Sequence, residues 1–96
     1  AMNPFYGCCT TSGGMAAFDL ATGAKRWFLP TIKQAPQRTG SHWLFVGKYG
    51  PSGAAVWGGP SYDAARNRIY FGTGQNYSHP TTDTSDAIFA VDAATG

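Results

Sequence analysis

Two short apolar runs along the chain end in the same polar sequence. Residues 15–23 read MAAFDLATG and residues 88–96 read IFAVDAATG, which places Asp19 and Asp92 in equivalent positions of the two copies. In each copy, four apolar residues precede Asp-x-x-Thr-Gly, a pattern that predicts a β-strand followed by a hairpin turn with glycine at a positive φ. Self-similarity of this kind is the mark of a repeat architecture.

Other apolar and aromatic runs predict further strands. After the first copy, residues 24–29 (AKRWFL) continue as a second strand. Another hairpin is predicted further along: residues 61–63 end its first strand, 64–67 form the turn, and 68–74 are its second strand, which ends in glycines. We predict no helix in any segment.

Long polar stretches separate these strands. Residues 30–56 are rich in Pro, Gly and Gln, and residues 75–86 form a second polar loop. The distance from Asp19 to Asp92 is longer than one propeller blade. If about 25 residues of the first polar stretch are an insertion, the remaining distance matches the ~40–50 residues of a blade. The sequence therefore predicts an all-β fold, a partial β-propeller of about one and a half blades of antiparallel strands. In this prediction, residues 14–29 are the outer strands of one blade, 30–56 an inserted loop, and 57–96 the inner strands and third strand of the next.

Composition supports this class and excludes others. The 96 residues include 13 glycines and 15% aromatic residues, and the 12% of charged residues is about half the usual quarter. The scarcity of helix formers excludes a helical bundle, a coiled coil and a charged disordered tail. The net charge of +2 predicts no nucleic-acid partner. No apolar stretch approaches the ~20 residues of a membrane span. We expect no signal peptide in this chain, and we expect the chain to be a segment of a longer protein.

Several of these runs resemble a known family. Residues 17–27 (AFDLATGAKRW) resemble the tryptophan-docking motif of quinoprotein β-propellers, in which the tryptophan stacks on the neighbouring blade. Residues 49–57 (YGPSGAAVW), 69–78 (IYFGTGQNYS) and 83–88 (DTSDAI) resemble the polyvinyl alcohol dehydrogenase branch of PQQ-dependent alcohol dehydrogenases. The likeness covers residues 6–96, which is a minor part of a full enzyme.

The resemblance implies a cofactor site and gives five candidate residues for it. In related enzymes a tryptophan lies flat against PQQ, and at a set spacing further along the chain, just after Gly-Thr-Gly, an asparagine binds Ca²⁺. Here the tryptophan is Trp57 and the later position is Gln75, with Asn76 next to it, so the metal ligand is either Gln75 or Asn76. Amide oxygens are suitable ligands for Ca²⁺. Cys8 and Cys9 resemble the vicinal disulfide that such enzymes place against the quinone, a strained bridge typical of functional sites; the alternative is a pair of buried thiols.

The same resemblance implies a function for a longer parent protein. It would oxidise an alcohol to a carbonyl with PQQ and calcium, in the periplasm or outside the cell, and would pass electrons to cytochrome c. The catalytic Asp of the family has no counterpart here, so we expect no turnover by the isolated chain. We expect this chain to pack against the remaining blades of its parent, and to self-associate when alone through unpaired strand edges.

A different class of function remains open at this point. A non-enzymatic β-propeller repeat, acting as a scaffold that binds protein partners, shares the docking motif but does not need the spacing of Trp57 and Gln75 or the adjacent cysteines. Trp57 itself would then be an ordinary core tryptophan. We expect Trp27 to be structural. His42 and His79 have no metal-ligand partner at a useful spacing, and we expect His79 to be solvated. We expect Asp83 and Asp86 to lie in a solvated turn, with cation binding as the alternative. The chain has no nucleophile elbow, P-loop or zinc-protease motif, which excludes those hydrolase and nucleotide-binding classes.

Overall fold

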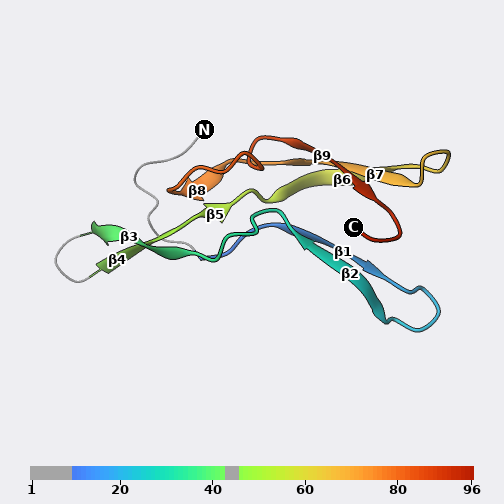
Figure 1. The fold of residues 1–96 in the computed structure, drawn as a ribbon, viewed down its shortest axis with the longest axis horizontal. Helices are drawn as coiled ribbons and strands as arrows, with labels where there is room; N and C mark the ends of the chain where they lie inside the picture. The colour runs from blue at the N-terminus through green and yellow to red at the C-terminus, as the bar shows by residue number, and fades with distance from the viewer. Residues whose placement is uncertain (1–9, 43–45) are drawn as a thin grey trace.

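The computed structural model describes residues 10–42 and 46–96, and within these ranges it contains strands and turns but no helix. The described strands form four small antiparallel sheets, so the all-β prediction is confirmed (Figure 1). Their bounds are β1 (Gly14–Phe18), β2 (Lys25–Pro30), β3 (Gln37–His42), β4 (Val46–Gly50), β5 (Ser52–Gly53), β6 (Val56–Asp63), β7 (Arg68–Thr73), β8 (Asn76–Ser78) and β9 (Ile88–Asp92).

The two sequence repeats fold into the same turn. After β1, the Asp19 carboxylate oxygen Oδ1 accepts hydrogen bonds from the N–H groups of the second and third residues that follow, at 2.9 and 3.0 Å. After β9, Oδ1 of Asp92 does the same at 2.8 and 3.1 Å. Both turns close on a glycine with positive φ, Gly23 and Gly96, whose N–H lies 2.8 Å from the aspartate carbonyl. The internal repeat is therefore a structural repeat.

Three strands form the sheet that follows the first hairpin. Strand β7 lies in the middle, paired with β6 on one side and β9 on the other. The turn between β6 and β7 occupies residues 64–67, as predicted, and is closed by the Asp63 carboxylate, which accepts from the Arg66 backbone and side chain. Among the described residues no strand pairs with the other edge of β9. The sheet thus has three strands, with one edge of β9 unpaired within the described ranges.

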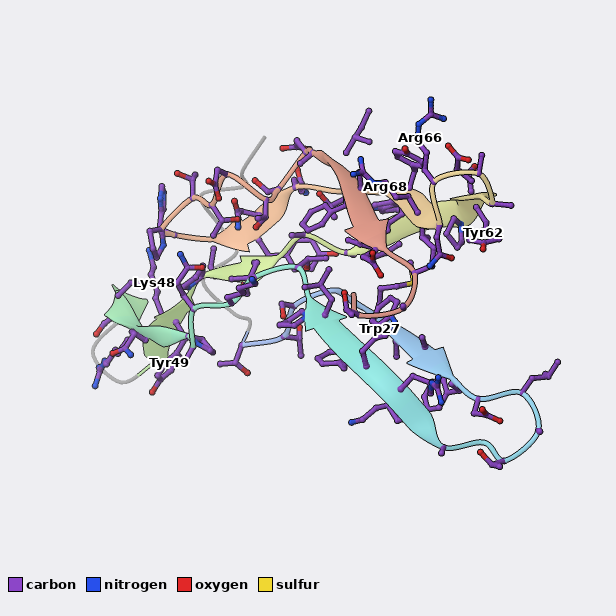
Figure 2. All side chains as sticks on the ribbon, turned by 45° about the vertical axis from the view of Figure 1, so that its right-hand side comes forward. Trp27, Lys48, Tyr49, Tyr62, Arg66 and Arg68 are labelled. Carbon is purple, nitrogen blue, oxygen red and sulfur yellow. The ribbon has the colours of Figure 1, made fainter. Side chains whose placement is uncertain are left out.

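A small apolar core joins the β1–β2 hairpin to this sheet. Trp27 on β2, Phe71 on β7 and Val91 on β9 are buried, and the Phe71 and Phe89 rings stack with centroids 4.9 Å apart. The Trp27 indole N–H donates to the Ala93 carbonyl at 3.0 Å, so this side chain lies against the second repeat turn (Figure 2). Trp27 thus links the β1–β2 hairpin to the turn that follows β9.

The segment predicted as an inserted loop, residues 30–56, contains strands of its own. Strands β3 and β4 form a hairpin that lies at the opposite end of the molecule from the β1–β2 turn (Figure 1). The sequence of β3, QRTGSH, has no alternation of apolar and polar residues, so no side-chain pattern marks this strand. The hairpin is visible only in its backbone pairing with β4. Close to the start of the segment, the buried Thr31 hydroxyl donates to the carbonyls of Gly13 and Ala54 at 2.9 and 2.8 Å. Thr31 therefore ties the first hairpin to the chain that enters β6.

The repeat turn predicts a specific response to acid. The N–H groups of Thr22 and then Ala21 stabilise the Asp19 carboxylate, which lowers the pKa of Asp19 below its ordinary value of 3.8. The stability that the turn gains from this charge is present above the unfolded pKa and is lost as the pH falls through the folded pKa. We expect Asp19→Asn, which keeps the oxygen acceptor, to lose less stability than the unsubstituted chain between pH 6 and pH 2. Urea denaturation at both pH values tests this, and equal losses would contradict it.

Candidate functional site

Two candidate residues that are well separated in sequence lie at the same end of the three-stranded sheet. Trp57 lies near the start of β6, and Gln75 follows shortly after the end of β7. Because β6 and β7 are antiparallel and joined by a short turn, the start of one lies beside the end of the other, and Trp57 pairs with Gly72 in the ladder. The spacing between Trp57 and Gln75 is thus the length of one hairpin, which brings both residues to the end of the sheet opposite the β6–β7 turn.

Trp57 presents its ring to the outside of the described structure. Its exposed fraction is 70%, whereas that of Trp27 in the core is 9%. The indole of Trp57 packs directly over Gly74, where an added Cβ would lie 2.8 Å from the indole Cδ1. Only a residue without a side chain lets the ring approach the backbone this closely. In this segment the Trp57 indole is therefore exposed and lies close to the backbone of Gly74.

Gln75 and Asn76, the two amide residues that follow Gly74, have different surroundings. Gln75 is half-buried, and its side chain makes no hydrogen bond to another residue within 10–42 and 46–96. Its backbone carbonyl accepts from the Ala54 N–H at 2.9 Å, which attaches it to the segment before β6. Asn76 has an exposed fraction of 1%. Its amide makes hydrogen bonds to Ser52 and Thr82, so both its donor and its acceptor are used within the protein.

Other candidate residues are distributed differently. Cys8 and Cys9 lie outside the described residues. Asp83 and His79 are exposed in the loop after β8. In the described part of the chain, no three His, Cys, Asp or Glu side chains are grouped in a way that could hold a metal ion. The site defined by Trp57 and Gln75 therefore offers a flat aromatic surface and an amide, without a cluster of charged ligands from the same ranges.

Two contributors to this edge were not singled out from the sequence. The sequence pattern marks Gly74 only as the end of a strand, although its missing side chain lets the Trp57 indole approach the backbone closely. The signal that points to it is the Gly-Thr-Gly run after an aromatic strand. Thr82 lies in the polar loop after β8, and its residue type indicates no special role there. Its contact with Asn76 depends on how that loop folds, which the sequence pattern does not indicate.

Comparison with known proteins defines the class. The chain belongs to the PQQ glucose/ethanol/alcohol dehydrogenase β-propeller domain family, whose model matches residues 5–96. The prediction of a partial β-propeller of quinoprotein type is therefore confirmed.

Two relatives that match the whole chain share one enzyme name. The chain is 38% identical over all 96 residues to a polyvinylalcohol dehydrogenase of a Sphingopyxis species (strain 113P3). It is 29% identical over the same 96 residues to a polyvinylalcohol dehydrogenase of a Pseudomonas species. The chain spans 15% of the length of each of these relatives. No solved structure matches it significantly. The described residues include no helix that is both long and apolar enough to cross a membrane.

Proposed function

We propose that this chain is a segment of a PQQ-dependent alcohol dehydrogenase that acts on polyvinyl alcohol or a similar secondary alcohol, and that it supplies one wall of the cofactor site. The observation that carries the proposal is the exposed indole of Trp57, held on Gly74 beside Gln75. The relatives named above support the choice of reaction, because they match along the whole chain. The longer protein that would contain this segment is called the parent below.

The residues at this edge fit a planar cofactor. A quinone of several fused rings stacks well on an indole face, and such stacking contributes roughly 1–3 kcal/mol by analogy with stacked nucleic-acid bases. Because Gly74 lets the indole lie close to the backbone, Trp57 would stack on one face of the cofactor and exclude water from that face. When bound, PQQ supplies the hydride acceptor for alcohol oxidation and Ca²⁺ supplies a Lewis acid.

Gln75 is the residue that we propose as the calcium-facing amide. Its side chain is free of hydrogen bonds to the described residues, whereas the Asn76 amide is engaged. Ca²⁺ takes about 6–8 oxygen ligands, so other parts of the parent would have to supply most of them. The same holds for the catalytic base and for the cytochrome c that would accept the electrons. We propose that Cys8 and Cys9 contribute to the rim of this site, and that the parent works in the periplasm or outside the cell.

Substitution of Trp57 in the parent tests the cofactor role. We expect Trp57→Ala to weaken PQQ binding by about five- to a hundredfold, which corresponds to the stacking energy above at about 1.4 kcal/mol per factor of ten. Trp57→Phe should retain part of the affinity. The melting temperature of the cofactor-free protein should change little, since 70% of this side chain is exposed. Titration of the apo protein with PQQ, followed by tryptophan fluorescence, gives the affinities.

Tyr62 provides the matched control. It lies on the same strand as Trp57 but next to the β6–β7 turn, with an exposed fraction of 62% (Figure 2). Tyr62→Ala removes a similarly exposed aromatic ring and should leave PQQ affinity unchanged. If Trp57→Ala lowers the apo melting temperature and leaves PQQ affinity per folded molecule unchanged, Trp57 is structural and the proposed site is wrong.

A further inference from the structure

We propose that Asn76 is a positioning residue, which holds the backbone around Gln75 so that the Gln75 amide and the Trp57 ring keep a fixed relation to each other. This inference rests on the proposed function of Trp57 and Gln75. It assigns to Asn76 a role different from that of a metal ligand.

The hydrogen bonds of Asn76 connect two segments that are distant in sequence. Its Nδ2 donates to the Ser52 carbonyl at 3.3 Å and to the Thr82 hydroxyl at 3.2 Å. Its Oδ1 accepts from the Thr82 N–H at 2.9 Å and from the Thr82 hydroxyl at 3.4 Å. One buried amide thus joins β5 to the loop after β8. Because its donors and its acceptor are used and water is excluded, the amide is held in one orientation.

The backbone next to Asn76 makes hydrogen bonds of its own to two other segments. The Gly74 N–H donates to the Ala55 carbonyl at 2.8 Å, and the Gly74 carbonyl accepts from the Asp86 N–H at 2.9 Å. The Gln75 carbonyl accepts from Ala54 at 2.9 Å. The consecutive residues 74–76 are therefore tied to the segment before β6 or to the loop that precedes β9. Within this run the Gln75 side chain is the group that remains available.

The strands alone would hold this arrangement weakly. Strands β5 and β8 form only two residue pairs, Ser52 with Ser78 and Gly53 with Asn76, with an irregular register between them. Isolated two-stranded pairings of this length have little stability of their own. The buried Asn76 amide adds side-chain hydrogen bonds beside this two-pair ladder. Its loss would let residues 74 and 75 move relative to Trp57 while the three-stranded sheet stays intact.

Thr82 is the better place to test this role, because truncating the buried Asn76 itself could prevent folding. Thr82→Val keeps the size of the side chain and removes the hydroxyl that contacts Asn76. Thr82→Ser restores the hydroxyl. Ser85→Ala is the matched control, since it removes a hydrogen bond of 2.9 Å from the Ser85 hydroxyl to the Thr82 carbonyl within the same loop and leaves the Asn76 contacts in place.

The experiment uses the parent with added PQQ and CaCl₂ and measures two quantities. Tryptophan fluorescence gives the CaCl₂ concentration for half-maximal loading, and hydrogen exchange gives the protection of the Ala54 and Gly74 amides. We expect Thr82→Val to raise the half-saturating CaCl₂ concentration about tenfold, the lower end of the range for residues that orient metal ligands. Exchange of both amides should become faster. Thr82→Ser and Ser85→Ala should stay within about twofold of the unsubstituted parent.

The outcomes separate this inference from the proposed function. If Thr82→Val speeds exchange and leaves calcium loading unchanged, Asn76 is merely structural and the inference is wrong. Equal effects of Thr82→Val and Ser85→Ala would also overturn it, since they would report loop stability in general. If the unsubstituted parent does not bind PQQ, or if Trp57→Ala has no effect on binding, the proposed function fails and this inference falls with it.

Discussion

Trp27→Ala is expected to lower the free energy of unfolding by about 3–5 kcal/mol, the usual cost of removing a buried tryptophan. The side chain is 9% exposed, contacts the small core around Phe71 and Val91, and donates its N–H to Ala93. A loss of this size approaches the whole stability of a small domain, which starts at about 5 kcal/mol. We therefore expect the variant to lose its cooperative unfolding transition in urea, measured by near-ultraviolet circular dichroism.

Two further variants distinguish packing from general effects of substitution in β2. Phe28 is the next residue on the strand and is 57% exposed, so Phe28→Ala should cost only about 1 kcal/mol. Trp27→Phe keeps an aromatic ring and loses the N–H donor to the Ala93 carbonyl, so its loss should be intermediate. If Trp27→Ala and Phe28→Ala destabilise the chain equally, the docking contact does not hold the two sheets together.

Gly53→Ala is the second substitution with a large expected effect. Gly53 has a φ of +100°, and an added Cβ would lie 2.6 Å from both the Gln75 carbonyl oxygen and the Tyr77 nitrogen. These are backbone atoms, which cannot rotate away as a flexible side chain can. Strain at this φ costs about 1–2 kcal/mol and overpacking about 1–3 kcal/mol more, so we expect a total loss of about 2–5 kcal/mol. The backbone of Gln75 should also shift, which would weaken PQQ binding in the parent.

Gly58 separates the two causes. It also has a positive φ, +73°, but no atom lies within 4 Å of the position that a Cβ would take. Gly58→Ala should therefore show the conformational strain alone, about 1–2 kcal/mol. Urea denaturation of both variants gives the comparison, and equal losses would mean that the close approach of Gly53 to Gln75 does not contribute.

Much of the fold could be predicted because its strands carry a pattern. The two Asp-x-x-Thr-Gly turns, the strands beside them and the turn at 64–67 all lie where the apolar runs and glycines indicate. The β3–β4 hairpin and the β5–β8 pairing were not predicted. Their strands are polar or very short, and backbone hydrogen bonds do not depend on the side-chain pattern that sequence reasoning uses.

The candidate site was predictable to a lesser degree. Trp57 and Gln75 were identified by resemblance, and the hairpin between them explains their spacing. The difference between Gln75 and Asn76 could not be foreseen, because it depends on Ser52 and Thr82. Both of these residues lie in segments without a recognisable pattern, and only the folded loop brings them to the Asn76 amide.

The two aspartate turns have the same hydrogen-bond pattern, and this has a consequence for engineering. Residues 19–91 contain one complete period, from one turn up to the start of the next, together with the tryptophan that lies on the following turn. In tandem copies of this period, each internal turn would contact the tryptophan of the preceding copy. Each three-stranded sheet would gain a fourth strand from the copy that follows. The period is thus a repeat unit with matching ends, from which the blades of a closed propeller could be assembled as consensus copies.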